Sequence, residues 1–294
     1  MKIVVLGAGG QLGRELAGVW ADEAIHLTRS DLDLREADAV CRRLREIRPS
    51  VVVNAAADNR VDLAESDPGS AFATNATGAA HVARVCAQLD ALLVHTSTDY
   101  VFDGRSARPY HEDDRPNPLN AYARSKHAGE RLVAALAPRH VIIRLAGLYA
   151  QGGSRGKGGS FVDRVLARAR AGESLRIVDD QVTAPTWARD VAQVIARLIP
   201  RWQRDPDITG ILHVSNAGAC SWYEFARNIL ALCAVDADLK PVASATFDAP
   251  AARPAYSVLA NARLASLGEP SLRDWHAALC AYLHDQGEPA AEVS

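Results

Sequence analysis

The sequence predicts an α/β fold, a Rossmann-type doubly wound parallel sheet with a smaller, mixed C-terminal lobe. In the first half, short apolar runs alternate with amphipathic stretches, and strands that alternate with helices form a parallel sheet covered on both faces. A glycine-rich segment directly follows the first apolar run, at residues 7–13. After Ala150 the alternation weakens, which indicates a second lobe of different construction.

Hydrophobic periodicity gives the expected elements in chain order. For the first half it predicts strands at residues 2–6, 25–27, 51–53, 92–95 and 141–145, and helices at 11–20, 37–47, 68–89 and 119–136. For the second half it predicts helices at 161–171, 187–198, 222–232 and 272–284, and strands at 175–178 and 211–214. Residues 151–159 contain five glycines and are expected to form a mobile loop, and the tail after Gln286 is expected to fray.

Composition and charge narrow the classes of partner. The 294 residues are 48% hydrophobic and 23% charged, with a formal net charge of -2, which favours neither nucleic acid nor an anionic membrane as a partner. No apolar stretch approaches the ~20 residues that span a bilayer, and the run before Gly7 is too short for a signal peptide. The cysteines are widely spaced, so we expect a cytoplasmic protein with buried free thiols at Cys41, Cys86, Cys220, Cys233 and Cys280.

The segment GAGGQLG stands between the first strand and the first helix. Its G-x-x-G-x-x-G spacing permits a tight turn, close approach of backbone N–H groups to a pyrophosphate, and close packing of helix on strand. In this context the spacing predicts a dinucleotide site. The residues of this segment expected to hold the cofactor are Gly7, Gly9, Gly10, Gln11, Leu12 and Gly13.

The end of the second strand indicates which dinucleotide is preferred. A carboxylate there would bind the ribose of NAD, whereas an arginine accommodates the 2′-phosphate of NADP. The strand ends in Thr28-Arg29-Ser30, with Asp33 following later. Arg29 therefore favours NADPH, with NADH as the alternative.

Tyr122 and Lys126 form a Tyr-x-x-x-Lys pair on a predicted helix. Residues four apart share a helix face, and a lysine ammonium there is expected to lower the pKa of the phenol so that it can protonate a developing alkoxide. Thr98 follows the fourth strand, at the sheet edge where ligands bind. Its hydroxyl can bind a substrate carbonyl and complete a Thr–Tyr–Lys set.

These motifs resemble those of the extended short-chain dehydrogenase/reductases, and within them the dTDP-4-dehydrorhamnose reductases. The resemblance covers nearly the whole chain, and its most specific parts are STDYVFDG at residues 97–104 and DDQVTAPTWARDVA at residues 179–192. It implies NADPH-dependent reduction of the C4 keto group of a dTDP-4-keto-6-deoxy-L-sugar, in deoxysugar and cell-surface polysaccharide biosynthesis. It also implies a dinucleotide-binding domain of residues 1–150, joined by returning segments, and a mainly sugar-nucleotide-binding lobe of residues 151–294.

The resemblance also assigns roles to individual residues. Tyr122 would be the general acid, Lys126 would bind the nicotinamide ribose, and Thr98 would orient the keto oxygen. Further cofactor contacts would come from Asp33, Leu34, Ala55, Ala56 and Ala57, and substrate contacts from Asn59, Asp99, Tyr100 and Arg253.

Two positions need separate comment, one for the sugar pocket and one for a metal-linked dimer. Gly147 stands where relatives commonly carry an aromatic residue that lines the sugar pocket, so a gap is expected there. Glu15 occupies the place of a glutamate that some relatives use for a metal-linked dimer, but no partner residues are evident; we expect no metal, and a homodimer stays open.

Three other functions stay open at this point. A different sugar-nucleotide reductase, or an epimerase of the same fold, would share the tyrosine and lysine. A non-catalytic NADP-binding regulatory subunit is the third.

Overall fold

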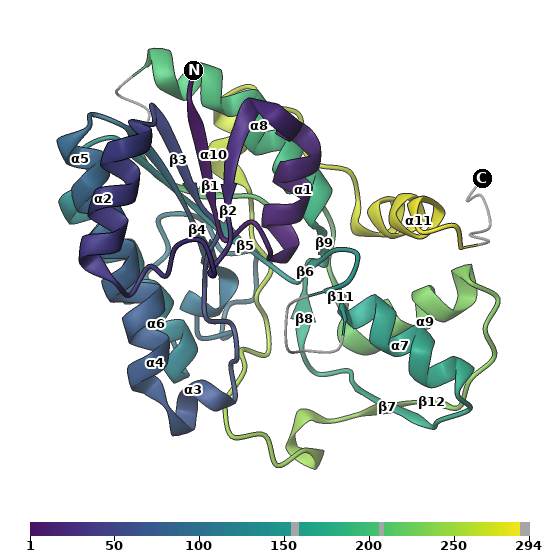
Figure 1. The fold of residues 1–294 in the computed structure, drawn as a ribbon. Coiled ribbons are helices and arrows are strands. Elements are labelled where there is room, and N and C mark those ends of the chain that lie inside the picture. The colour runs from purple at the N-terminus through teal and green to yellow at the C-terminus, as the bar shows by residue number, and fades with distance from the viewer. Residues whose placement is uncertain (154–158, 206–208, 289–294) are drawn as a thin grey trace.

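The computed structural model describes residues 1–153, 159–205 and 209–288. Its centre is a six-stranded parallel sheet with the order β10-β5-β4-β3-β1-β2 (Figure 1). The strands are β1 (Ile3–Leu6), β2 (Ala24–Leu27), β3 (Val51–Asn54), β4 (Leu92–Thr98), β5 (His140–Leu145) and β10 (Gly210–His213). Because β2 and β3 lie on opposite sides of β1, the winding reverses between β1 and β3, where doubly wound sheets bind ligands. The predicted fold class is confirmed.

Helices cover both faces of this sheet. On one face lie α1 (Gln11–Trp20), α8 (Ala188–Arg204) and α10 (Ala262–Ser266), and on the other α2 (Ala37–Ile47), α5 (Ala79–Gln88) and α6 (Ala121–Leu136) (Figure 1). Successive side chains of a strand point to opposite faces. Ile3 and Val5 therefore pack with α1 and α8, whereas Val4 and Leu6 pack with α2 and α5.

The helix predicted over residues 68–89 is divided. The chain forms α3 (Leu63–Ser66), α4 (Pro68–Phe72), a π-helical segment (Ala73–Gly78) and only then α5. Within the π segment, the buried Asn75 side chain bonds both the N–H and the carbonyl of Asp58 and also the Ser125 hydroxyl. This tertiary contact ties the helix to a loop at the sheet edge.

The C-terminal lobe has its own apolar core, formed mainly by α7 (Phe161–Arg170), α9 (Trp222–Leu232) and α11 (Trp275–Asp285). Three small sheets complete it: β12 (Leu239–Val242) with β7 (Leu175–Val178), β11 (Cys220–Ser221) with β8 (Val182–Thr183), and β6 (Leu148–Tyr149) with β9 (Thr186–Trp187). Short 3₁₀ turns lie at Ala21–Glu23, Asp99–Val101 and Ser244–Thr246. In Figure 1 this lobe lies beside the carboxyl ends of the main strands.

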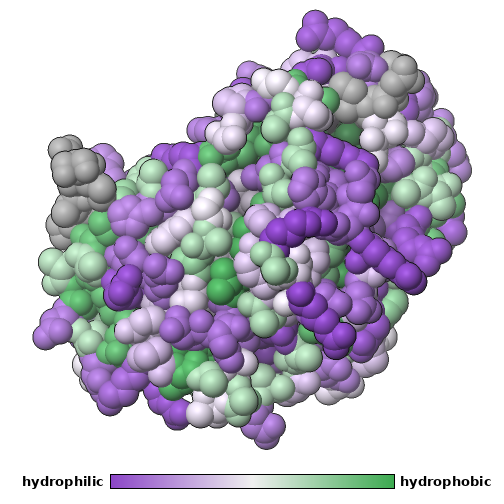
Figure 2. All heavy atoms as spheres, turned by 180° about the vertical axis from the view of Figure 1, so that it is seen from behind, coloured by the Kyte–Doolittle hydropathy of each residue, from purple (hydrophilic) through white to green (hydrophobic). Residues whose placement is uncertain are grey.

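Figure 2 views the molecule from behind relative to Figure 1, and on that face hydrophilic residues are spread over both the sheet domain and the lobe. Within the described ranges, no helix combines the length and apolar character needed to cross a membrane.

Candidate active site

A cavity of about 530 Å³ lies where the carboxyl ends of β1, β3 and β4 face the C-terminal lobe. Both halves of the chain line it, which is typical of ligand sites in doubly wound folds. The residues predicted from sequence that line it are Gly7, Gly9, Gly10, Gln11, Leu12, Arg29, Asp33, Leu34, Ala55, Ala56, Ala57, Asn59, Thr98, Asp99, Tyr100, Tyr122 and Lys126.

Two expected residues do not line this cavity. A Cβ on Gly13 would lie 2.3 Å from the Gly7 carbonyl oxygen, so Gly13 permits close helix–strand packing and not ligand contact. The Arg253 guanidinium donates to Asp62 at 2.7 Å and to the Ala251 carbonyl, and lies beside Tyr100.

The glycine-rich turn has the geometry that the motif predicts. Gly7 has φ +78°, and its N–H and that of Ala8 donate to the Leu27 carbonyl at 2.9 and 3.0 Å. A Cβ on Gly7 would lie 2.6 Å from the backbone of Ala56, so only glycine fits between β1 and the exit of β3. The turn therefore presents the N-terminus of α1 to the cavity, where an anion is stabilised.

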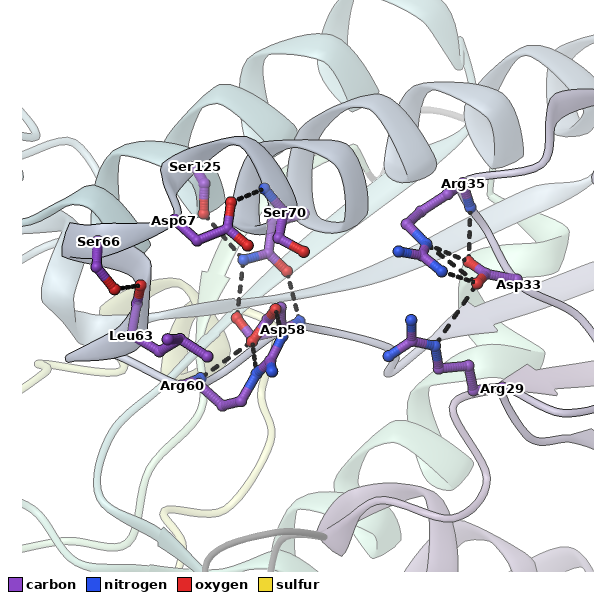
Figure 3. Close-up of polar contacts among 11 residues, drawn as sticks. Arg29, Asp33, Arg35, Asp58, Arg60, Leu63, Ser66, Asp67, Ser70 and Ser125 are labelled. Atoms are coloured by element: carbon purple, nitrogen blue, oxygen red, sulfur yellow. Dashed lines mark hydrogen bonds and ion pairs between the residues drawn. The ribbon is translucent and has the colours of Figure 1, made fainter.

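At the end of β2, two arginines surround Asp33 (Figure 3). Arg35 binds its carboxylate with Nε at 3.0 Å and a terminal nitrogen at 2.6 Å, and the Arg29 Nε lies 3.6 Å away. The hydrogen bond from Arg35 lowers the pKa of Asp33 to about 2. The Asp33 carboxylate thus forms its close ion pair with Arg35, and the Arg29 side chain is 67% exposed at the cavity rim. Sequence reasoning singled out Arg29 but not Arg35.

Thr98, Tyr122 and Lys126 converge in the cavity. Thr98 is the last residue of β4, which runs three residues further than predicted, and its hydroxyl donates to Asp99 at 3.0 Å. Tyr122 and Lys126 lie on one face of α6, whose N-cap Asn120 accepts from the Ala123 N–H at 2.8 Å. The Lys126 Nζ donates to the Thr96 carbonyl at 2.7 Å, which fixes α6 against β4.

The expected lowering of the phenol pKa is wrong. Burial raises the pKa of Tyr122 to about 12, although a hydrogen bond with Thr98 opposes this shift. Burial also lowers the pKa of Lys126 to about 8, against the charge of Glu130. Desolvation outweighs charge here because Lys126 is only 2% exposed and the partly buried Tyr122 packs against α3 and α4. A phenol that keeps its proton at neutral pH suits a general acid.

Asp99 adds a second titratable group beside Thr98. Burial raises the pKa of Asp99 to about 6, while hydrogen bonds from the Ser257 and Thr98 hydroxyls oppose the shift. The Tyr100 ring contacts Tyr122 edge to face, with the ring centroids 6.2 Å apart. These contacts form one packed group at the end of β4.

Several residues that line the cavity were not anticipated. They are Thr28, Leu32, Asp58, Arg60, Val61, Thr74, Thr96, Ser97, Leu145, Leu148, Gln181, Val182, Thr183, Trp222, Pro254 and Ser257. Gln181 to Thr183 belong to the motif at residues 179–192, which could have indicated them. Asp58 and Arg60 form an ion pair at the rim (Figure 3), and no local pattern marks Trp222.

Gly147 is not simply a missing side chain. It has φ +51°, and a Cβ there would lie 3.0 Å from the Pro185 Cα and 3.1 Å from the Ala184 carbonyl oxygen. The backbone itself is therefore arranged for glycine, which corrects the expectation of a plain gap. The expectation of a mobile loop at residues 151–159 falls largely on residues 154–158, which lie outside the described residues.

Glu15 is occupied within the chain. Its carboxylate accepts from the Arg189 Nε at 3.0 Å, and Arg189 also binds Asp285 at 2.6 and 2.9 Å. Within the part of the chain that the structure describes, no cluster of three or more His, Cys, Asp or Glu residues could hold a metal ion.

Comparisons with known proteins agree with this architecture. The family model of the RmlD substrate binding domain matches residues 1–287. The chain belongs to this family. It is 40% identical over 292 residues to a dTDP-4-dehydrorhamnose reductase from Mycobacterium tuberculosis, covering 96% of this chain and 92% of that protein. A 39% identical relative from Streptomyces antibioticus is described as a probable dTDP-4,6-dihydroxy-2-methyloxan-3-one 4-ketoreductase, with 95% of this chain and 93% of that protein covered.

One similar solved structure contains a bound cofactor. It is a dTDP-4-dehydrorhamnose reductase from Bacillus anthracis in complex with NADP, 33% identical, with a TM-score of 0.91 over 97% of this chain and 99% of that one. That enzyme thus shares the fold of this chain over nearly its whole length.

Proposed function

We propose that the protein is an NADPH-dependent ketoreductase that converts dTDP-4-dehydrorhamnose, a dTDP-4-keto-6-deoxy-L-sugar, to dTDP-L-rhamnose. The observation that carries this proposal is the convergence of Thr98, Tyr122 and Lys126 in one cavity with the glycine-rich turn. Similarity over nearly the whole chain to reductases that bear this name supports the substrate class. The product would enter cell-surface polysaccharide biosynthesis, and the use of NADPH and a nucleotide sugar suits the cytoplasm.

The residues at the turn fit a dinucleotide. The N-terminus of α1 and the glycine backbone suit a pyrophosphate, and Leu34, Ala55, Ala56 and Ala57 supply apolar walls. Asp33, the carboxylate 3.6 Å from the Arg29 Nε, is bound by Arg35 and is therefore not free to bind a ribose. This arrangement favours the 2′-phosphate of NADPH over the ribose of NADH.

NADPH, when bound, supplies the hydride that reaches C4 of the sugar. The Thr98 hydroxyl orients the keto oxygen, and Tyr122 donates the proton that turns this oxygen into the new hydroxyl. Lys126 binds the nicotinamide ribose and keeps a positive charge near the phenol. Tyr122 is well suited to this role, because a phenol with a pKa of about 12 stays protonated until an alkoxide develops beside it.

We assign the dinucleotide to residues 1–150 with β10, and the nucleotide sugar mainly to residues 151–294. Asn59, Asp99 and Tyr100 line the cavity between the two and would contact the sugar nucleotide. Arg253, which is paired with Asp62, would contribute by holding Tyr100 in place.

The test is NADPH oxidation with enzymatically prepared dTDP-4-keto-6-deoxy-L-sugar, followed by NMR of the product. Turnover with a single C4 configuration, and loss of turnover in Tyr122→Phe, is the expected result. Interconversion of two sugars with no net NADPH consumption would instead indicate an epimerase. NADPH binding without turnover of any keto sugar would indicate a regulatory subunit.

A further inference from the structure

The five tryptophans of the chain differ in their exposure. Four are buried, with exposed fractions of 6% for Trp20, 3% for Trp187, 1% for Trp202 and 8% for Trp275. Trp222 alone is partly exposed, and it lines the cavity that holds Tyr122 and Lys126. A large aromatic ring at the wall of a ligand cavity provides apolar contact area that other wall residues do not match.

Trp222 is held in a fixed position by the lobe. It is the first residue of α9, whose N-cap Ser221 accepts from the Glu224 N–H at 3.0 Å. Its own N–H donates to the Gln181 carbonyl at 3.3 Å. The indole packs against Phe161, with the ring centroids 4.7 Å apart. The ring is therefore supported from inside the lobe while it lines the cavity.

The segment that carries Trp222 is connected to the catalytic end of the cavity. Ser221 pairs with Val182 in the small sheet of β11 and β8, and the hydroxyl of the next residue, Thr183, lies 3.2 Å from that of Ser257. The Ser257 hydroxyl also stabilises the carboxylate of Asp99, the neighbour of Thr98. The glycine-rich turn, by contrast, contributes to the cavity from the sheet domain, between β1 and α1.

Gly147 lines the same cavity but has no side chain, and its surroundings leave little space for one. The aromatic surface on the lobe side of the cavity thus comes from Trp222. An indole face is complementary to the C–H face of a pyranose, and to the methyl group of a 6-deoxy sugar, more than to a charged pyrophosphate.

We propose that Trp222 is a specificity-determining residue whose indole packs against the sugar ring of the nucleotide-sugar substrate. This inference rests on the proposed function. Trp222→Ala is expected to raise the KM for the keto sugar by about 3- to 10-fold, as the loss of one aromatic contact implies. Trp222→Phe keeps an aromatic ring and should stay close to the wild type, and neither variant should change the KM for NADPH.

Acrylamide quenching of tryptophan fluorescence tests the contact without turnover, and with the wild-type chain. Because the other four tryptophans are buried, most of the quenching should come from Trp222 and disappear in Trp222→Phe, with Trp20→Phe as the matched control. We expect dTDP-L-rhamnose to protect this fluorescence and dTDP or NADP⁺ to protect it much less.

Equal protection by dTDP would place the ring on the base, and protection by NADP⁺ would place it on the nicotinamide; either result overturns the inference. Bound dTDP-L-rhamnose that leaves quenching unchanged overturns it as well. These outcomes differ from a failure of the proposed function, in which the wild-type protein neither binds dTDP-L-rhamnose nor oxidises NADPH with the keto sugar. That failure would remove this inference too.

Discussion

Replacing Arg144 by methionine should lower the free energy of unfolding by about 3–5 kcal/mol, because it leaves a buried carboxylate without its partner. Arg144, on β5, binds Glu130, on α6, through two hydrogen bonds of 2.8 Å. Their side chains are only 1% and 3% exposed. The guanidinium also lies over the Phe102 ring, 5.1 Å from its centroid. Methionine can replace the apolar contact but not the charge.

The lowered pKa of Glu130 expresses the same interaction on a free-energy scale. Burial alone would raise this pKa, but hydrogen bonds from Arg144 and His127 and the Arg144 charge lower it from 4.5 to about 2. At 1.36 kcal/mol per pH unit, this corresponds to about 3 kcal/mol that favours folding with the carboxylate ionised. Since the pKa is lowered in the folded state, this contribution is complete above about pH 4.5 and is lost as pH falls towards 2.

Urea unfolding followed by circular dichroism, at pH 7 and at pH 3, measures both effects. Arg144→Met should be much less stable than the wild type at pH 7, with a smaller difference at pH 3. Arg168→Met, which removes an exposed ion pair to Glu173, is the control and should change stability by less than about 1 kcal/mol. The double variant Glu130→Leu/Arg144→Met should recover much of the loss, because no buried charge remains.

The reasoning is refuted if Arg144→Met changes the free energy of unfolding as little as Arg168→Met does. It is also refuted if the double variant is no more stable than Arg144→Met.

Four further outcomes follow from the site. Glu130→Gln removes the carboxylate charge that opposes the lowering of the Lys126 pKa. The rate of NADPH oxidation should fall as Lys126 loses its proton above about pH 8, and in this variant the fall should begin at a lower pH; an unshifted pH profile would contradict this. Tyr122→Phe should lower kcat by about 10²–10⁴-fold with little change in NADPH affinity, measured by fluorescence titration; near-native turnover would remove it as the acid. Arg29→Ala should raise the KM for NADPH and leave that for NADH unchanged, and an equal effect on both cofactors would count against the 2′-phosphate contact. Gly147→Ala should lower stability by about 1–2 kcal/mol because of its left-handed backbone, and an unchanged melting temperature would contradict the geometry.

The sequence by itself determined the features whose physics is local. The alternation of apolar runs with amphipathic helices predicts the parallel sheet, because each strand and helix must bury its own apolar residues. The spacing of Gly7, Gly10 and Gly13 predicts the turn, because only glycine permits those backbone contacts. Tyr122 and Lys126 were found because four residues bring two side chains to one helix face.

The tertiary structure alone decided what depends on distant parts of the chain. The pKa of Tyr122 is set by burial, with its ring packed against α3 and α4, so a pair rule that considers only Lys126 gave the wrong direction. The pairing of Asp33 with Arg35, and the place of Trp222 in the cavity wall, likewise leave no periodic pattern in the sequence. Burial and packing arise from many long-range contacts at once, and those contacts exist only after the chain has folded.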